Sequence, residues 1–261
     1  MRLAFALPQM LRNDILAQLS VEIFSDLRPF LTRVRLVRGQ VLIEPGHDVE
    51  HIFFIEDGMV SLVAEPTANR ASMQVAMIGR EGIVGGMALL APTASSSITA
   101  ISQIPGPAVR INADALRSAV ERSPALRDLC LLFIHSLLVQ TMETAASNAQ
   151  NTLAERCVRW LLMAHERIES DELMITHEAL ATILGVRRSG VTVVVAALQE
   201  AGLIRANRGR ITIADRLGLE RAGGRSSQAV DAGLKAQRVG SSYLGSLQAV
   251  GTHAPANHAG T

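Results

Sequence analysis

The chain has 261 residues, which is enough for one large domain or two modest ones. Its formal net charge of +1 and isoelectric point near 7.9 exclude a globally basic protein. Aromatic residues make up 3% of the chain, which argues against a protein that binds single strands by stacking bases on aromatic rings.

The two cysteines, Cys130 and Cys157, fall in helical patterns and are expected to be buried, reduced thiols, as in a cytoplasmic protein. No CxxC spacing occurs, so the sequence predicts neither a zinc site nor an iron–sulfur cluster, and we expect no metal or other cofactor. The N-terminal apolar run is broken by Pro8 and is weak as a secretion signal. The longest apolar run, residues 129–139, is about half of the ~20 residues that a membrane span needs, so no membrane partner is expected.

The first predicted element is an amphipathic helix over residues 14–30. From Thr32 the hydrophobic period changes to two, and short predicted strands follow, separated by turn signals of Gly, Pro, Asn and Asp. A Gly-rich segment at 82–88 and a small-residue loop at 92–97 interrupt them. Many short strands at regular spacing predict an antiparallel barrel or roll. The strands are expected at residues 34–37, 41–44, 52–55, 60–64, 73–78, 98–101 and 108–111.

Helical patterns follow the strands. Asn112 or Asp114 can cap a short helix, and Ser123 with Pro124 begins a long one, because Pro fits the first helical position. The long helix, to about residue 147, is apolar nearly all round in its first half and must be covered on both sides. The roll can cover one side, and a second copy of the protein is the simplest cover for the other. A polar stretch at 148–151 can act as a hinge before another amphipathic helix at 152–168.

Residues 176–213 carry the strongest functional signal. Thr176 is a good N-cap, and the helical spacing that follows is interrupted at Gly185, which suits a positive φ angle. A small residue at Ala181, the turn glycine and an apolar plug at Val191 have the spacing of a helix-turn-helix unit. Two alternating segments joined by a Gly-containing turn then predict a β-hairpin, so the unit is expected to be a winged helix.

The charges of this unit lie where duplex DNA needs them. Between Arg187 and Ile213 the only acidic residue is Glu200, so this part is locally basic. Arginine can hydrogen-bond guanine through two parallel bonds, and a recognition helix points its first turn at base edges. Phosphate contacts supply most of the affinity of such a unit and make it dependent on salt. The residues predicted to contact DNA are Thr176, His177, Arg187, Arg188, Ser189, Thr192, Arg205, Arg208 and Arg210.

Two other functions stay open at this point. The first is a dimeric β-roll interaction module whose winged helix binds a protein partner through a solvated arginine face. The second is an enzyme, but the serines at 95–97 have no plausible base nearby, and the Gly85–Gly86 pair lacks the lysine of a phosphate-binding loop. We therefore predict no catalytic residue.

Four stretches in chain order resemble the Crp/Fnr family of bacterial transcription regulators: the 43–46 turn, the 52–58 strand and turn, the 82–85 segment and the helix-turn-helix. The resemblance covers about residues 14–219 and implies an α+β fold. It places an antiparallel, jelly-roll-like β-roll (a double-stranded β-helix) that senses a signal at 14–122, a long dimerisation helix at 123–148 and the winged helix-turn-helix at 149–220. The Gly-, Ser- and Ala-rich residues 221–261 are expected to be a disordered tail.

The resemblance also implies partners. It implies a homodimer that binds a two-fold-related site in double-stranded DNA, with recognition helices roughly 34–36 Å apart. Such a regulator works in the cytoplasm and can have RNA polymerase as a further partner. The sequence does not say whether it activates or represses.

The family's best-known effector is a cyclic nucleotide. Its phosphate cassette has a Gly, then a Glu for the ribose hydroxyl, and later an Arg followed by a small hydroxyl residue. Here the Gly is Gly85, Gly86 replaces the Glu, and Ser96 stands where the Arg belongs, before Ser97. Residues 82–108 contain no Arg or Lys, and a buried phosphate without a cation is costly. We expect this degenerate cassette not to bind cyclic AMP in the usual mode, and the effector stays unknown.

Other branches of the family sense through cysteine clusters, which this chain lacks, or through haem held by an axial ligand such as His. His47 and His51 are expected to be surface residues at a turn and a strand start rather than ligands. In the recognition helix Arg188 aligns with an Arg that better-known members use for base contact, whereas Ser189 and Val193 replace a Glu and an Arg. The target sequence is therefore expected to differ from theirs.

Overall fold

The computed structural model describes residues 11–64, 72–91 and 96–224. It begins with two short helices, α1 (Asp14–Ala17) and α2 (Val21–Leu27), and a 3-10 turn, η2 (Arg28–Phe30). The single helix expected over residues 14–30 is therefore wrong. Ser20 has extended backbone and accepts a hydrogen bond from the N–H of Ile23, so it starts a second helix. The hydrophobic periodicity alone predicts one continuous helix.

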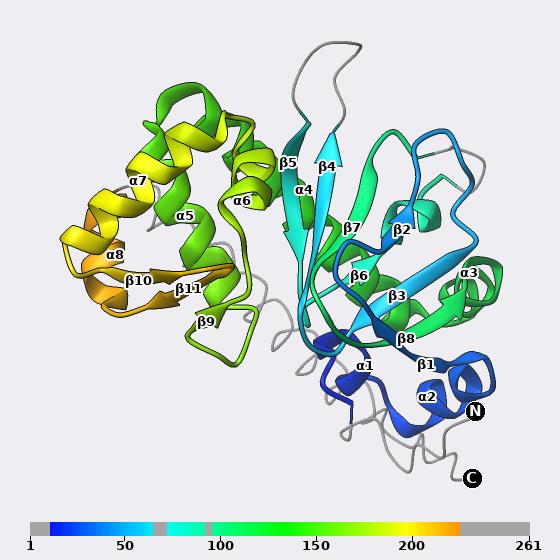
Figure 1. The fold of residues 1–261 in the computed structure, drawn as a ribbon. Coiled ribbons are helices and arrows are strands. Elements are labelled where there is room, and N and C mark those ends of the chain that lie inside the picture. Colours follow the sequence, from blue (N-terminus) through cyan, green and yellow to red (C-terminus); the bar gives the residue numbers. More distant parts are fainter. Residues whose placement is uncertain (1–10, 65–71, 92–95, 225–261) are drawn as a thin grey trace, which may run out of the picture.

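The roll is built from short strands. They are β1 (Thr32–Leu36), β2 (Val41–Ile43), β3 (His51–Ile55), β4 (Met59–Ala64), β5 (Met73–Ile78), β6 (Ile83–Val84), β7 (Thr99–Ile104) and β8 (Gly106–Asn112). In the described residues they form two four-stranded antiparallel sheets, with the orders β1-β8-β3-β6 and β2-β7-β4-β5 (Figure 1). A 3-10 turn, η3 (Gly86–Leu89), follows β6. The predicted antiparallel roll is confirmed.

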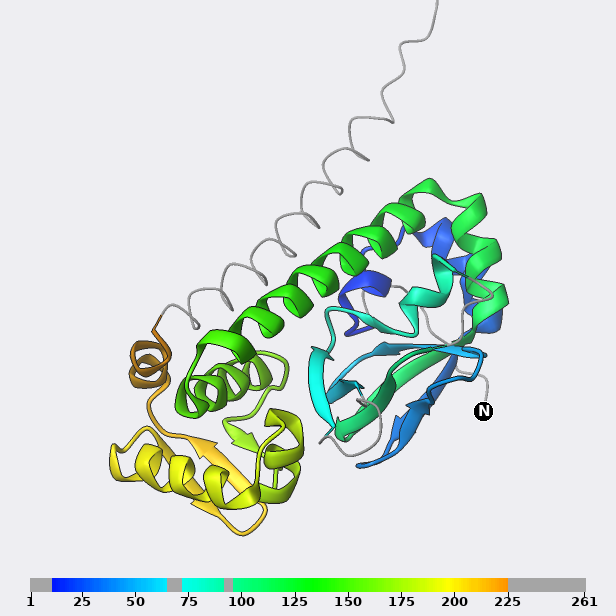
Figure 2. The ribbon, with the colours of Figure 1, turned by 90° about the horizontal axis from the view of Figure 1, so that it is seen from above.

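Helices α3 (Ala113–Arg122), α4 (Pro124–Gln150) and α5 (Leu153–His165) follow the roll. Asn112 caps α3 and Ser123 caps α4, with Pro124 in the first turn of α4. Figure 2 shows α4 lying along the roll and ending beside the C-terminal unit. The side of α4 that faces the roll is buried through Leu126, Leu129, Cys130, Phe133 and Ile134.

The break between α4 and α5 lies later than the polar stretch suggests. Helix α4 continues through residue 150, and the chain turns at Asn151, whose backbone is extended. Thr152 and Glu155 then form a capping box: the Thr152 hydroxyl accepts the N–H of Glu155, and the Glu155 carboxylate accepts the N–H of Thr152 at 2.8 Å. The helices expected to be separated by residues 148–151 are thus interrupted only at residues 151–152.

Helix α4 is long and apolar enough to cross a membrane by length and composition alone, with a mean hydropathy of 1.4 over its most apolar window. A helix that packs along a globular domain passes the same test. One side of α4 is buried against the roll, so packing within the chain explains the apolar residues on that side.

The C-terminal unit contains α6 (His177–Leu184), α7 (Arg188–Glu200) and a sheet of order β10-β11-β9, made of β10 (Ile204–Asn207), β11 (Arg210–Ile213) and β9 (Glu172–Leu173). A last helix, α8 (Arg216–Gly223), follows Asp215, whose carboxylate accepts the N–H of Gly218 at 2.8 Å. Our sequence reasoning missed β9 and α8. Residues 221–223, expected in the tail, are helical, and residues 225–261 lie outside the described residues.

Candidate nucleic-acid interface

The corner between α6 and α7 is built as the sequence predicts. The two helices meet at 109°. Gly185 ends α6 with a φ angle of 64°, and the N–H of Val186 donates to the carbonyl of Ala181 at 3.0 Å. Ala181 and Val191 are 3% and 0% exposed, so the plug and the close approach of the helices are both present.

Helix α7 has one buried and one exposed side. Val191, Val195 and Leu198 face the core. The residues predicted to contact DNA at the start of α7 are all exposed: Arg187, Arg188, Ser189 and Thr192. The β-branched residues that make α7 a poor isolated helix therefore serve its packing, and tertiary contacts decide its conformation.

Several of the predicted residues contact one another. Nδ1 of His177 lies 3.2 Å from the hydroxyl of Thr192, which donates to the carbonyl of Arg188 at 3.1 Å. The guanidinium of Arg188 lies 3.9 Å from the carboxylate of Glu178, a residue on α6 that the sequence reasoning did not consider. The hydroxyl of Thr176 caps α6 by accepting the N–H of Ala179. The structure thus brings the first turns of α6 and α7 side by side.

The wing lies beside α7. Gln199 of α7 accepts the N–H of Ala206 at 2.7 Å, which ties β10 to the recognition helix. Arg205 and Arg208 are exposed, as is Arg210, which pairs with Glu172 of β9 at 3.1 Å. The sequence reasoning missed Glu172 as a partner of Arg210 because the two are 38 residues apart and β9 has two residues.

The four residues of the predicted effector cassette are Gly85, Gly86, Ser96 and Ser97. Gly85 has a φ angle of 91°, and Gly86 is buried, where an added Cβ would lie 3.0 Å from Cγ1 of Ile83 and would need that side chain to shift. The hydroxyl of Ser96 is used locally, donating to the carbonyl of Ile98 at 2.8 Å. Ser97 is exposed. None of the four supplies a positive charge for a phosphate.

The histidines and cysteines occupy the environments that the sequence suggests. His47 lies 3.8 Å from Glu44 and His51 lies 4.0 Å from Glu50, and the two side chains are 72% and 37% exposed. Within the described ranges no group of three or more His, Cys, Asp and Glu side chains is placed to hold a metal ion. Cys130 and Cys157 are buried free thiols, and burial raises the pKa of each to about 12.

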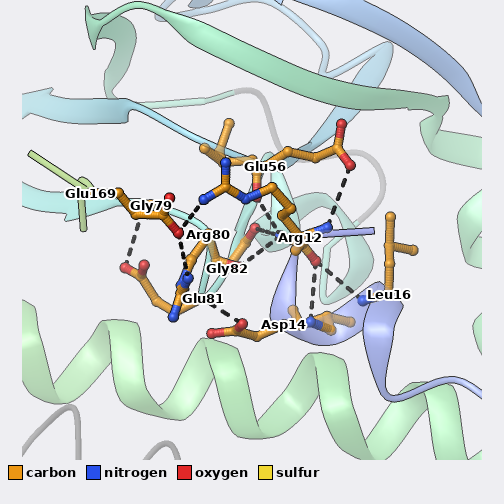
Figure 3. A network of polar contacts seen from close by, with 12 residues as sticks. Arg12, Asp14, Leu16, Glu56, Gly79, Arg80, Glu81, Gly82 and Glu169 are labelled. Carbon is orange, nitrogen blue, oxygen red and sulfur yellow. Dashed lines mark hydrogen bonds and ion pairs between the residues drawn. The ribbon is translucent and has the colours of Figure 1, made fainter. Parts of the chain in front are cut away.

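The winged-helix unit is fixed to the roll beside the Gly-rich segment. Nε of Arg167 donates to Glu81 at 2.7 Å, with the two side chains 2% and 10% exposed. Glu169 pairs with Arg12 and with Arg80, the latter at 3.5 Å (Figure 3). The hydrogen bond from Arg12 holds the pKa of Glu169 below its usual value. Glu81 and Arg80 lie four and five residues before Gly85 in the chain.

A second junction joins β5 to the helices. The indole N–H of Trp160 donates to Gln74 at 3.3 Å, and the amide of Asn148 contacts the sulfur of Met73. A small cavity of about 30 Å³ lies there, lined in part by Gln74, Arg159 and Trp160. Met59, Met77 and Ile104 of the roll share a hydrophobic core with the winged-helix unit. The winged-helix unit therefore packs directly on the roll.

Two family models match this chain, one over the roll and one over the winged-helix unit. A family model described as a cyclic nucleotide-binding domain matches residues 33–123, and one described as a Crp-like helix-turn-helix domain matches residues 155–222. The chain belongs to the Crp/Fnr family of transcription regulators. This Crp/Fnr regulator is 24% identical over 185 residues to the global nitrogen regulator of Synechococcus elongatus, covering 67% of the chain and 82% of that protein.

Solved structures of Crp/Fnr proteins share its fold. A putative Crp/Fnr regulator from Eubacterium rectale matches with a TM-score of 0.63 and 18% identity, covering 79% of this chain and 96% of the other. The c-di-GMP responsive global regulator CLP of Xanthomonas campestris matches with a TM-score of 0.61 and 20% identity, covering 74% and 99%. The DNA-binding regulator inferred from the sequence is thereby supported, because the roll and the winged-helix unit each match a family model.

Proposed function

We propose that this DNA-binding transcription regulator binds a two-fold-related operator as a homodimer and reads bases with the first turns of α7. The observation that carries the proposal is the exposed start of α7, where Arg187 and Arg188 begin a helix that packs on the core through Val191, Val195 and Leu198. In this proposal the β-roll at 14–122 is the sensor, the helix at 123–148 joins two copies, and the unit at 149–220 binds DNA.

The predicted contacts divide into two kinds. Arg188 and Ser189 lie exposed in the first turn of α7 and are assigned to base edges. The remaining candidates are assigned to phosphates, because they lie at the start of α6, just before α7, beside His177 or on the wing. They are Thr176, His177, Arg187, Thr192, Arg205, Arg208 and Arg210.

The exposed side of α4 supports the homodimer. Leu131, Leu138 and Met142 are 44%, 53% and 61% exposed, and His135 lies among them. Residues 131, 135, 138 and 142 follow the alternating four- and three-residue spacing of a two-stranded coiled-coil seam. A two-fold axis along this seam would pair each residue with its own copy, which is the commonest symmetry of soluble oligomers.

The roll is proposed not to bind cyclic AMP in the usual mode, because Gly86 and Ser96 replace the charged members of the cassette. CLP, which shares the fold, is described as responsive to c-di-GMP, so a roll of this shape need not answer to cyclic AMP. The effector of this chain is not assigned. We place the protein in the cytoplasm, with RNA polymerase as a further proposed partner.

Selection of bound fragments from random duplex DNA, followed by footprinting of the winner, tests the proposal. We expect two protected half-sites related by a two-fold axis. The logarithm of affinity should fall linearly with the logarithm of salt concentration, by about 0.9 per phosphate contact. If no sequence is enriched and binding to duplex is insensitive to salt, the winged helix is better explained as a surface for a protein partner.

A further inference from the structure

One exposed apolar side chain stands on the reading side of α7. Val193 is 69% exposed, among the most exposed large hydrophobic residues of the described chain. Single exposed apolar residues are common on protein surfaces, so exposure alone assigns nothing. The position of Val193 on the helix is what matters.

Val193 points directly away from the core. It lies two residues after Val191 and two before Val195, which are 0% and 2% exposed. At 100° per residue, two residues turn a side chain through about 200°, so Val193 occupies the side opposite the packed one. That side of a recognition helix enters the major groove.

The neighbours of Val193 offer few polar side-chain atoms that could hydrogen-bond bases in this part of the groove. The hydroxyl of Thr192 is already bonded to the Arg188 carbonyl and to His177. Ala196, one turn on, is exposed and has no polar side-chain atom. The apolar feature that a major groove offers is the C5-methyl group of thymine.

We propose that Val193 packs against the C5-methyl group of a thymine and makes the operator require thymine at that position. The inference rests on the proposed function and adds a contact to thymine that the arginines do not make. A β-branched side chain has one strongly preferred rotamer in a helix, so the isopropyl group is held in place before binding. A cytosine there would leave its amino group against an apolar side chain, without a hydrogen-bond partner.

The spacing places this thymine relative to the base that Arg188 reads. Five residues advance a helix by about 7.5 Å, which is roughly two base-pair steps for a helix lying along the groove. The thymine is therefore expected about two base pairs from the guanine of the same half-site.

Deoxyuridine substitution tests the inference, because uracil lacks only the methyl group. In the operator obtained by selection, each thymine of one half-site is replaced in turn, and affinity is measured for the wild type and for Val193→Ala. Val21→Ala is the matched control, since Val21 is another exposed helical valine, 55% exposed, in α2 of the roll. Alanine favours helix more than valine, so both variants should fold.

The wild type and Val21→Ala should lose about three- to fourfold in affinity at one thymine, the value of roughly one buried methyl group. Val193→Ala should bind the unmodified operator about three- to fourfold more weakly and should not distinguish thymine from uracil at that position. If no thymine responds, or if Val193→Ala still responds at the same one, the inference is wrong although the operator is bound. If selection enriches no sequence, the proposed function fails and the inference fails with it.

Discussion

Arg167, just after α5, and Glu81, between β5 and β6, form a buried ion pair across the junction of the roll and the winged-helix unit, with Nε and Oε1 2.7 Å apart. The two residues are 86 positions apart in the chain. Arg167 also donates to the carbonyl of Met163 at 2.9 Å, and Glu81 accepts the N–H of Gly79 at 3.1 Å. The pair therefore fixes one fold unit on the other through charges with further hydrogen bonds.

Glu81→Gln should lower the free energy of unfolding by about 3–5 kcal/mol, because it leaves the buried Arg167 guanidinium without its carboxylate. Glu172→Gln, which removes the exposed partner of Arg210, is the control and should cost about 0–1 kcal/mol. Urea denaturation of the two variants measures the difference. Equal losses would mean that water already screens the pair at the junction.

Arg188→Ala should weaken binding to the selected operator by about 1–3 kcal/mol and relax the preference at one base position. Arg208→Ala on the wing is the comparison: it should weaken binding on every duplex alike and reduce the salt slope by about 1. Titration of operator and unrelated duplexes over a salt series separates the two. A uniform loss for Arg188→Ala would make it a phosphate contact.

Leu138→Glu should convert the homodimer to a monomer, since it would put two carboxylates against each other in the proposed α4 seam. Leu217→Glu is the matched control, because Leu217 is 69% exposed on α8 and lies outside that seam. Sedimentation equilibrium gives the mass of each variant. A wild type that sediments as a monomer at micromolar concentration would remove the dimer from the proposal.

Cyclic AMP should give no saturable heat in a calorimetric titration at micromolar ligand. The reason is electrostatic: residues 82–108 hold no Arg or Lys, and the Ser96 hydroxyl already bonds to the Ile98 carbonyl. The same titration after Ser96→Arg asks whether a cation alone restores binding. We expect it does not, because Gly86 still stands where the Glu that holds the ribose belongs. Micromolar binding by the unaltered chain would contradict the prediction.

The two buried thiols should resist a disulfide reagent at pH 8 in the native protein and react fully in denaturant. With each pKa raised to about 12, the ionised fraction at pH 8 is on the order of 10⁻⁴. The unfolded thiols ionise as pH rises through about 9, so the unfolded state then binds fewer protons and the free energy of unfolding falls above that pH. Rapid reaction without denaturant would show that α4 or α5 opens readily.

The local parts of this fold are predictable because short-range signals specify them. Ser123 with Pro124 starts α4, Thr176 starts α6, and Gly185 makes the corner, as each residue's own chemistry indicates. The split between α1 and α2 could have been found from Ser20 as an N-cap, and α8 from Asp215.

The junction between the two units could not be found in this way. Arg167, Glu169 and Trp160 meet Glu81, Arg80 and Gln74 only once the chain has folded back on itself, and no spacing in the sequence records that approach. For the same reason the partners Glu178 and Glu172 of the predicted DNA-contact arginines were missed. The tertiary structure therefore decides which of these arginines pair with an acidic side chain and which face DNA alone.

Gly185 is constrained from two directions. Its left-handed backbone disfavours any other residue, and a Cβ placed there would lie 2.8 Å from the terminal methyl group of Met73 on β5. The corner between α6 and α7 thus lies directly against β5 of the roll. If the roll is the sensor, as we propose, a displacement of β5 would act first on the residue that sets the angle of the recognition helix.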